Sequence, residues 1–377
     1  MNPALSILRD LIALPSVNPA LLPGGDPRAG ERRVMEYLAA AARRAGLKVV
    51  LQPVLPGRAN VLAILRPTGP VRQRVMLAPH MDTVGVSSED QFKPVLRRGR
   101  LHGRGACDTK GSVAAMFAAV LAVAASARRP AATEITFCAL VDEEVHQAGS
   151  RAWVRSGGKA DLAIVGEPTR CRVVTAHKGD LWLQLETRGR AAHGARPDLG
   201  KNAVHAMARV VDWLETDYAA RLRRRRHPLL GHATVNVGAI AGGRQPNIVP
   251  DRCVIKVDRR TLPGENDRVV KRDLLASLRR RGHRVTLVDS KGAAPASPLQ
   301  TDPRLPLVGR FLRASGQERG EGVDYFTDAG VLAAGGIPSV VFGPGDIAQA
   351  HTPDEWVAVS QLERATAILT RFLATLE

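Results

Sequence analysis

The sequence predicts an α/β fold, with a mainly parallel sheet sandwiched by helices and a smaller α+β domain inserted into it. Two observations support this. Between about residues 35 and 175, short continuous apolar runs alternate with helical stretches, as in parallel sheets buried on both faces. Between about 180 and 290, apolar and polar residues alternate along the strands instead. The first pattern returns after residue 300, so the second domain is an insertion.

The larger domain is expected to hold continuous apolar strands and one long alanine-rich helix. That helix, 111–129, ends in two arginines, which suit a helix C-terminus, and Pro130 follows it. The N-terminal residues form an amphipathic helix rather than a signal peptide, because they lack a basic segment. The expected strands are 60–65, 75–78, 134–141, 161–166 and 338–343, and a terminal helix starts at Leu362.

The inserted domain has six expected elements in the order β-α-β-β-α-β. This is the ferredoxin-like arrangement. The elements are 181–189, 202–222, 233–243, 252–262, 267–280 and 283–289. We therefore expect one domain over 1–178 and 291–377, and another over 179–290.

Composition limits the classes of protein that this chain can be. Of its 377 residues 45% are hydrophobic, yet no window holds the roughly 18 uninterrupted apolar residues of a membrane span. The four cysteines are dispersed without a C-x-x-C pair, which predicts reduced thiols and a cytoplasmic location. The charge of +18 raises the alternative of a nucleic-acid partner, but the one dense run, 221–226, has no aromatic residues beside it. A basic surface that attracts small anionic substrates explains the charge equally well.

Acidic and histidine side chains follow the strands of the larger domain. In open parallel sheets, ligands bind beyond the carboxyl ends of the strands, so these side chains should meet at one edge. Each alone has an ordinary explanation as a turn or surface residue. Together they match the nitrogen and oxygen ligands of zinc or cobalt, especially in a paired site bridged by one carboxylate. They are His80 and Asp82, Asp108, Asp142 to Glu144, Glu167, and His351.

The three consecutive acids Asp142, Glu143 and Glu144 follow a buried strand directly. Like charges repel, and removing even one from water is unfavourable. Either this loop is solvated, or a stronger positive charge lies beside it.

Five motifs resemble the co-catalytic zinc aminoacylase and carboxypeptidase family, which includes acetylornithine deacetylase, succinyl-diaminopimelate desuccinylase and carboxypeptidase G. They are "PHMDTV", "GRGACDTKG", "DEEV", "GEPT" and "AHTPDE", and they occur in the family's order over nearly the whole chain. The resemblance implies a zinc-peptidase-like catalytic domain, and an inserted domain that serves as lid and dimer surface. It also implies two divalent ions, zinc or cobalt.

The resemblance also implies the ligands of each ion. Asp108 would bridge the two ions. His80 and Glu167 would complete one site, and Glu144 and His351 the other. The dications would explain why the consecutive acids are tolerated.

Further roles follow from the same resemblance. Asp82 would accept a hydrogen bond from His80 and fix its tautomer. Glu143 would be the general base, and Asp142 would be structural.

The inserted domain would contribute three more residues, again by resemblance. His193 would stabilise the oxyanion, often across a dimer in this family, and Asn247 would hold the substrate. Arg260 would bind the substrate carboxylate, with Arg259 as the adjacent alternative on the opposite face of the strand.

"GEPT", "AHKGD" and "GPGDIAQAHTPDEW" are most similar to acetylornithine deacetylase-like members of the family. The predicted reaction is hydrolysis of an N-acyl amino acid, or of a peptide-like amide with a free carboxylate. The desuccinylase and the carboxypeptidases or dipeptidases of the family remain alternatives. Two other classes stay open: a catalytically silent binding protein, which should lack Glu143 or a ligand, and a basic nucleic-acid-associated protein.

Overall fold

The computed structural model describes residues 2–127, 129–288 and 296–377, and it divides into two compact units. Unit 1 comprises Met1–Ala176, Leu299–Gly322 and Thr327–Glu377, and unit 2 comprises His177–Pro298 and Val323–Phe326. Each unit has its own apolar core. The boundary expected between residues 290 and 291 lies outside the described residues.

Unit 1 is built on a sheet whose centre is parallel, as predicted. The four strands β6, β3, β7 and β17 are neighbours in this order and run parallel. All five residues of β7 are buried, so both faces of the sheet are covered there. In path order the strands are β1 (Lys48–Leu55), β2 (Arg58–Leu65), β6 (Thr133–Ala139), β3 (Gln73–Pro79), β7 (Leu162–Gly166), β17 (Ser339–Val341), β8 (Val174–His177) and β15 (Leu299–Gln300), with β16 (Glu321–Val323) beside β8.

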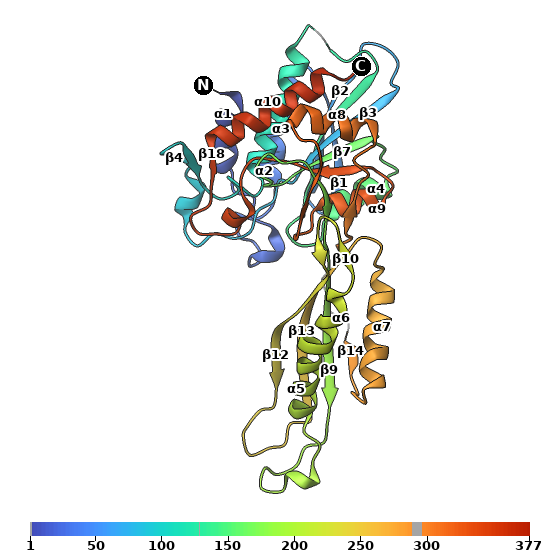
Figure 1. The fold of residues 1–377 in the computed structure, drawn as a ribbon. Helices are drawn as coiled ribbons and strands as arrows, with labels where there is room; N and C mark the ends of the chain where they lie inside the picture. Colours follow the sequence, from blue (N-terminus) through green and yellow to red (C-terminus); the bar gives the residue numbers. More distant parts are fainter. Residues whose placement is uncertain (1, 128, 289–295) are drawn as a thin grey trace. The chain divides into compact units, whose positions relative to one another are not determined.

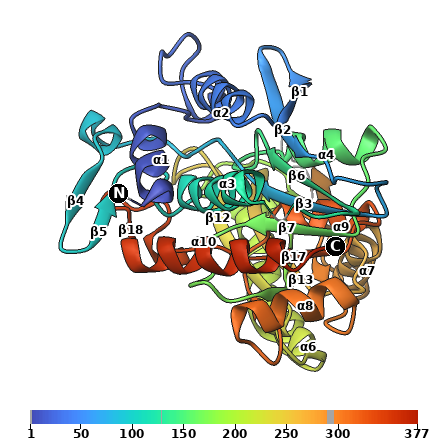
Figure 2. The ribbon, with the colours of Figure 1, turned by 90° about the horizontal axis from the view of Figure 1, so that it is seen from above.

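The helix predicted over 111–129 is α3 (Lys110–Ala125), which is apolar and buried almost all round. It packs against β3, β6 and β7 on one side and against α1 and α10 on the other (Figure 2). It ends at Ala125, and the Arg129 guanidinium donates two hydrogen bonds to the Ala124 carbonyl at that end. The other helices of unit 1 are α1 (Pro3–Ile12), α2 (Arg32–Arg44), α4 (Ala148–Arg155), α8 (Pro306–Ser315), α9 (Asp328–Ala334) and α10 (Val359–Ala374).

A small antiparallel sheet lies next to the segments that carry Asp108 and His351. Its strands are β4 (Val95–Arg97), β5 (Arg100–His102) and β18 (Trp356–Ala358), in the order β18-β5-β4. The pairing of β18 with β5 aligns Trp356 with His102. It therefore joins the chain after His351 to the chain before Asp108.

Unit 2 has the predicted β-α-β-β-α-β order (Figure 1). Its antiparallel sheet has the strand order β12-β13-β9-β14, and β13 alternates buried and accessible residues because one face packs on the core. The helix expected over 202–222 contains one π-helical turn, Leu214–Tyr218. The elements are β9 (Gly179–Arg188), α5 (Ala203–Trp213), α6 (Ala219–Arg223), β12 (Thr234–Gly242), β13 (Arg252–Thr261), α7 (Asp267–Arg280) and β14 (Thr286–Val288), plus the short pair β10 (Arg226–His227) and β11 (Gly231–His232).

Candidate metal centre

The parallel strands end at one edge of the sheet in unit 1, and the expected side chains follow them there. His80 comes directly after β3, Glu143 and Glu144 follow β6, and Glu167 follows β7. Asp108 lies in the loop before α3, which packs against these same strands. These side chains are buried: His80 is 2% exposed and Glu167 is 5% exposed, and the side chain of Glu144 is 5% exposed although its main chain is more accessible.

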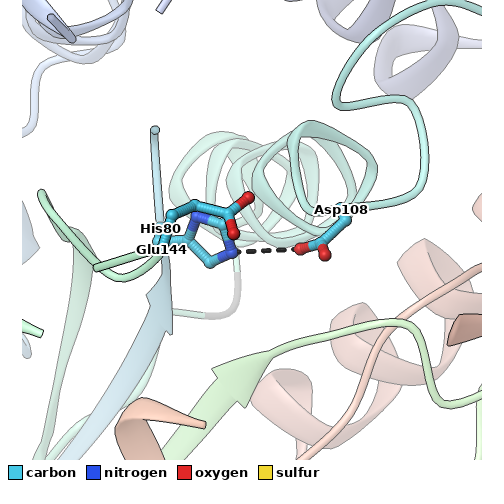
Figure 3. A group of neighbouring side chains, drawn as sticks. All are labelled: His80, Asp108 and Glu144. Atoms are coloured by element: carbon cyan, nitrogen blue, oxygen red, sulfur yellow. Dashed lines mark hydrogen bonds and ion pairs between the residues drawn. The ribbon is translucent and has the colours of Figure 1, made fainter. Parts of the chain in front are cut away.

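Asp108 lies between two histidines, with one oxygen toward each. Its Oδ1 is 3.2 Å from His80 Nε2, as the dashed line in Figure 3 marks, and its Oδ2 is 3.2 Å from His351 Nε2. Glu144 Oε2 is also 3.2 Å from His351 Nε2, whereas Glu167 Oε1 is 3.7 Å from His80 Nε2. The arrangement therefore has two halves that share the carboxylate of Asp108.

Asp82 holds the histidine and the acidic turn together. His80 Nδ1 lies 3.0 Å from the main-chain oxygen of Asp82 and 3.4 Å from its Oδ1, so the main chain offers the nearer acceptor. The Asp82 carboxylate accepts hydrogen bonds from the main-chain N–H groups of Glu143 (3.0 Å) and Glu144 (3.1 Å). Either acceptor favours a proton on Nδ1, which leaves Nε2 available as a ligand.

Charge and burial shift the pKa values of the side chains in this cluster. Hydrogen bonds to Asp108 and Glu144 raise the pKa of His351 to about 10. Burial raises the pKa of Glu144 to about 7, and it raises the pKa of Glu143 and of Glu167 well above the ordinary value. The ionised forms of these three glutamates are therefore destabilised. In Asp108, by contrast, the hydrogen bonds from His351 and His80 outweigh burial and lower the pKa.

This donor set fits divalent ions. Two groups of ligand atoms converge, one from His80, Asp108 and Glu144 and one from His80, Glu143 and Glu167. Glu144 Oε1 and Glu167 Oε1 are buried and have no hydrogen-bond partner within the part of the chain that the structure describes. A dication would stabilise the ionised carboxylates and the neutral imidazoles together.

A buried network behind the acidic turn was not predicted. The Arg58 guanidinium pairs with Glu31 (2.5 and 2.7 Å) and with Asp142 (2.9 Å). Asn18 Nδ2 donates to Asp142 and to Asp82, at 3.0 and 2.8 Å. Asp142 thus has a structural role, as expected. Nothing local marks Asn18, Glu31 or Arg58 in the sequence, because their partners are distant along the chain.

Another unpredicted acid, Asp328, is 1% exposed and accepts a hydrogen bond from the Ser150 hydroxyl. Burial raises its pKa to about 6. Its electrostatic influence extends to Glu143 and Glu167, whose pKa values it helps to raise.

The three candidate substrate residues lie in unit 2. His193 and Asn247 are exposed and adjacent, since Gly194 N–H donates to the Asn247 carbonyl (2.7 Å). Arg260 is held by Asp258 through two 2.9 Å hydrogen bonds. Arg259, the alternative, is 1% exposed and pairs with Glu265 inside the unit, so it points to the opposite face.

Comparison with known proteins identifies the family. The model of "Peptidase family M20/M25/M40" matches residues 76–375. The chain belongs to this family. Acetylornithine deacetylase from Myxococcus xanthus is 34% identical over 90% of this chain and 91% of its own length. Acetylornithine deacetylase from Edwardsiella ictaluri (strain 93-146) is 30% identical, over 98% of this chain and 96% of its own length.

Solved structures agree on the fold. An M20 family metallo-carboxypeptidase, Sso-CP2 from Sulfolobus solfataricus, superposes with a TM-score of 0.78 at 19% identity, covering 99% of both chains. The Bacillus subtilis YXEP protein, described as a dinuclear metal binding peptidase from the M20 family, gives 0.70 at 13% identity, covering 98% of this chain and 96% of its own.

The predicted family and class, a metal-dependent hydrolase of amide bonds, are thereby confirmed. None of the helices among residues 2–127, 129–288 and 296–377 has the length and apolarity to cross a membrane. The four cysteines are buried free thiols.

Proposed function

We propose that this M20 member hydrolyses N-acyl amino acids, with N-acetylornithine as the first candidate substrate. The observation that carries the proposal is the Asp108 carboxylate, which faces His80 with one oxygen and His351 with the other. The relatives named acetylornithine deacetylase, which match nearly the whole chain, support this substrate over the succinylated and peptide substrates of the family.

His80, Asp108 and Glu167 would hold one divalent ion, and Asp108, Glu144 and His351 the second. Zinc is the first candidate, because two imidazoles and three carboxylates suit it, and cobalt accepts similar ligands. When bound, the ions would lower the pKa of a water molecule and polarise the amide carbonyl.

Glu143 would move the proton. It is 9% exposed, and its main chain is fixed by Asp82. Its carboxylate lies close to those of the ligands, within the group of His80, Glu143 and Glu167. Because the assignment above does not use it as a ligand, it would be free to accept a proton from the attacking water. It would then deliver that proton to the leaving amine.

The residues of unit 2 would contact the substrate. Arg260 would bind the free carboxylate, because Asp258 already orients its guanidinium fork. His193 would stabilise the oxyanion, and Asn247 would hold the substrate beside it.

The geometry of unit 2 supports a homodimer. Arg252 and Arg260 stand near opposite ends of β13, about 26 Å apart along an extended strand. His193 and Asn247 lie in loops that join at the Arg252 end, where Gly189 N–H donates to the Asp251 carbonyl. An amino-acid substrate is shorter than this span. A second copy of the chain would therefore supply His193 and Asn247, and unit 2 would act as both lid and dimer surface.

Complementation tests the dimer. His193→Ala and Glu143→Gln variants should each be inactive. After mixing and subunit exchange, about a quarter of wild-type activity should return, because half of the dimers then hold one complete site. No recovery despite confirmed exchange would mean that His193 does not act across the dimer.

Amine release from a panel tests the substrate. The panel holds N-acetylornithine, other N-acetyl amino acids, N-succinyl-diaminopimelate, N-acylglutamates and dipeptides, each with zinc or cobalt and with a chelator control. Chelator-sensitive release from N-acetylornithine is expected. Faster release from the succinylated compound or from a dipeptide would move the chain to another branch of the family. The cytoplasmic location remains a prediction.

A further inference from the structure

Glu355 is a buried acid at the end of the "AHTPDE" motif, and it has no role in the proposed reaction. It is 2% exposed and its carboxylate receives four hydrogen bonds. Its Oε1 accepts from the main-chain N–H groups of Cys107 (2.8 Å) and Asp108 (2.9 Å). Its Oε2 accepts from the N–H of Gly105 (2.9 Å) and from Arg104 Nη1 (2.7 Å).

This carboxylate is enclosed by the loop that carries the shared ligand. Three of the four donors are main-chain N–H groups of the loop, and one of them is the N–H of Asp108 itself. With two bonds on each oxygen, Glu355 has no strong acceptor site left for an ion or a substrate. It therefore acts on the loop and not on the reacting atoms.

The same residue fixes the segment that carries His351. Glu355 follows His351 by four positions, and its main-chain oxygen accepts a hydrogen bond from Gly103 N–H (3.0 Å). The His351 side chain is 54% exposed, and its imidazole contacts Asp108 and Glu144. Because the imidazole itself is little enclosed, its place depends on the anchored chain that follows it.

We propose that Glu355 is a positioning residue that sets the spacing between Asp108 and His351, and thereby the affinity for the second metal ion. The proposal rests on the two-ion assignment made above. Residues that orient metal ligands typically change metal affinity by roughly 10- to 100-fold when they are replaced.

Glu355→Gln is the sharpest variant, because it keeps the shape of the side chain. One carboxylate oxygen becomes an NH₂ group, which would face two donors and could accept from neither. The matched control is Glu265→Gln in unit 2. The Glu265 carboxylate also accepts hydrogen bonds from an arginine (Arg259, 2.8 Å) and from a main-chain N–H (Leu262, 2.7 Å). The loop that it holds is remote in sequence from every proposed metal ligand.

The experiment is a titration of the metal-free full chain with cobalt(II). Calorimetry measures the affinities, and visible absorbance records the spectrum of each bound ion. Wild type and Glu265→Gln should bind two ions with the same affinities and spectra. Glu355→Gln should bind one of its two ions at least roughly tenfold less tightly than wild type does, with a changed absorbance for that ion. Unchanged affinity and spectrum in a folded Glu355→Gln protein would overturn the proposal. Failure of wild type to bind cobalt would instead overturn the two-ion assignment, and the Glu355 proposal with it.

Hydrogen exchange of the wild-type protein tests the same proposal without the variant, in case Glu355→Gln does not fold. Coupling between sites is reciprocal, so ion binding must stabilise the bonds that Glu355 makes. The amide of Gly105 is diagnostic, because Gly105 lies outside the proposed ligand set. Its exchange should slow when the second ion binds. Exchange at Gly105 that is the same with one ion and with two would overturn the proposal.

Discussion

Replacing Arg58 with methionine should destabilise unit 1 by about 3–5 kcal/mol, the usual loss when a buried ion pair loses one partner. The Arg58 side chain is 11% exposed, and its partners Glu31 and Asp142 are 1% and 3% exposed. Methionine preserves most of the volume, so the loss is electrostatic. Both carboxylates would stay buried without their cation.

The loss should shrink as the pH falls. Burial already raises the pKa of Glu31, and removing Arg58 raises it further. A carboxyl group whose pKa is higher in the folded state binds more protons there than in the unfolded chain. Its stabilising contribution is therefore complete below the unfolded pKa and disappears as the pH rises. The stability of the variant should thus approach that of wild type in mild acid, and the difference in free energy of unfolding should be largest near neutral pH.

The assay is equilibrium urea unfolding of the metal-free protein at several pH values, fitted with two transitions because each unit has its own core. The control is Arg74→Met, which removes an exposed pair with Glu134 at 3.6 Å and should lose no more than about 1 kcal/mol. Equal losses in the two variants would refute the account of the buried network.

Three further predictions concern single residues. Glu143→Gln should retain both metal ions by elemental analysis while amide hydrolysis falls by about 10²- to 10⁴-fold; an unchanged rate would remove Glu143 as the base. Arg260→Lys should raise KM more than it lowers kcat, since lysine cannot form the bidentate fork that Asp258 orients; an unaltered KM would argue against the clamp. Burial lowers the pKa of His177 to about 4, so the unfolded chain binds its proton first as the pH falls. Folding stability should therefore drop by about 2 kcal/mol between pH 7 and pH 5, and His177→Gln should remove that part of the drop in urea unfolding curves; an equally steep drop in the variant would contradict the assignment.

The parts of the fold that were predictable depend on local patterns. Continuous apolar runs predicted β3, β6 and β7, and their carboxyl ends place His80, Glu144 and Glu167 at one edge of the sheet. The antiparallel pairing of β2 with β6 was not predictable, because strands buried on both faces carry the same pattern in either direction.

The residues that support the site could not be predicted for a different reason. Arg58 pairs with Asp142 across 84 positions, and Glu355 contacts Asp108 across 247. Such contacts leave no periodic or spacing signal in a single sequence. Only the tertiary structure reveals that a buried arginine lies behind the acidic turn and that a buried glutamate holds the loop of the shared ligand.

The most direct test of the central claim is the number of divalent ions that each chain binds. The protein would be dialysed against micromolar zinc, freed of unbound metal and measured by elemental analysis beside a His80→Ala/His351→Ala double variant. We predict two ions per wild-type chain, one beside each of the two histidines that face Asp108, and a clear loss in the double variant. No bound zinc in wild type, or equal zinc in both proteins, would contradict it.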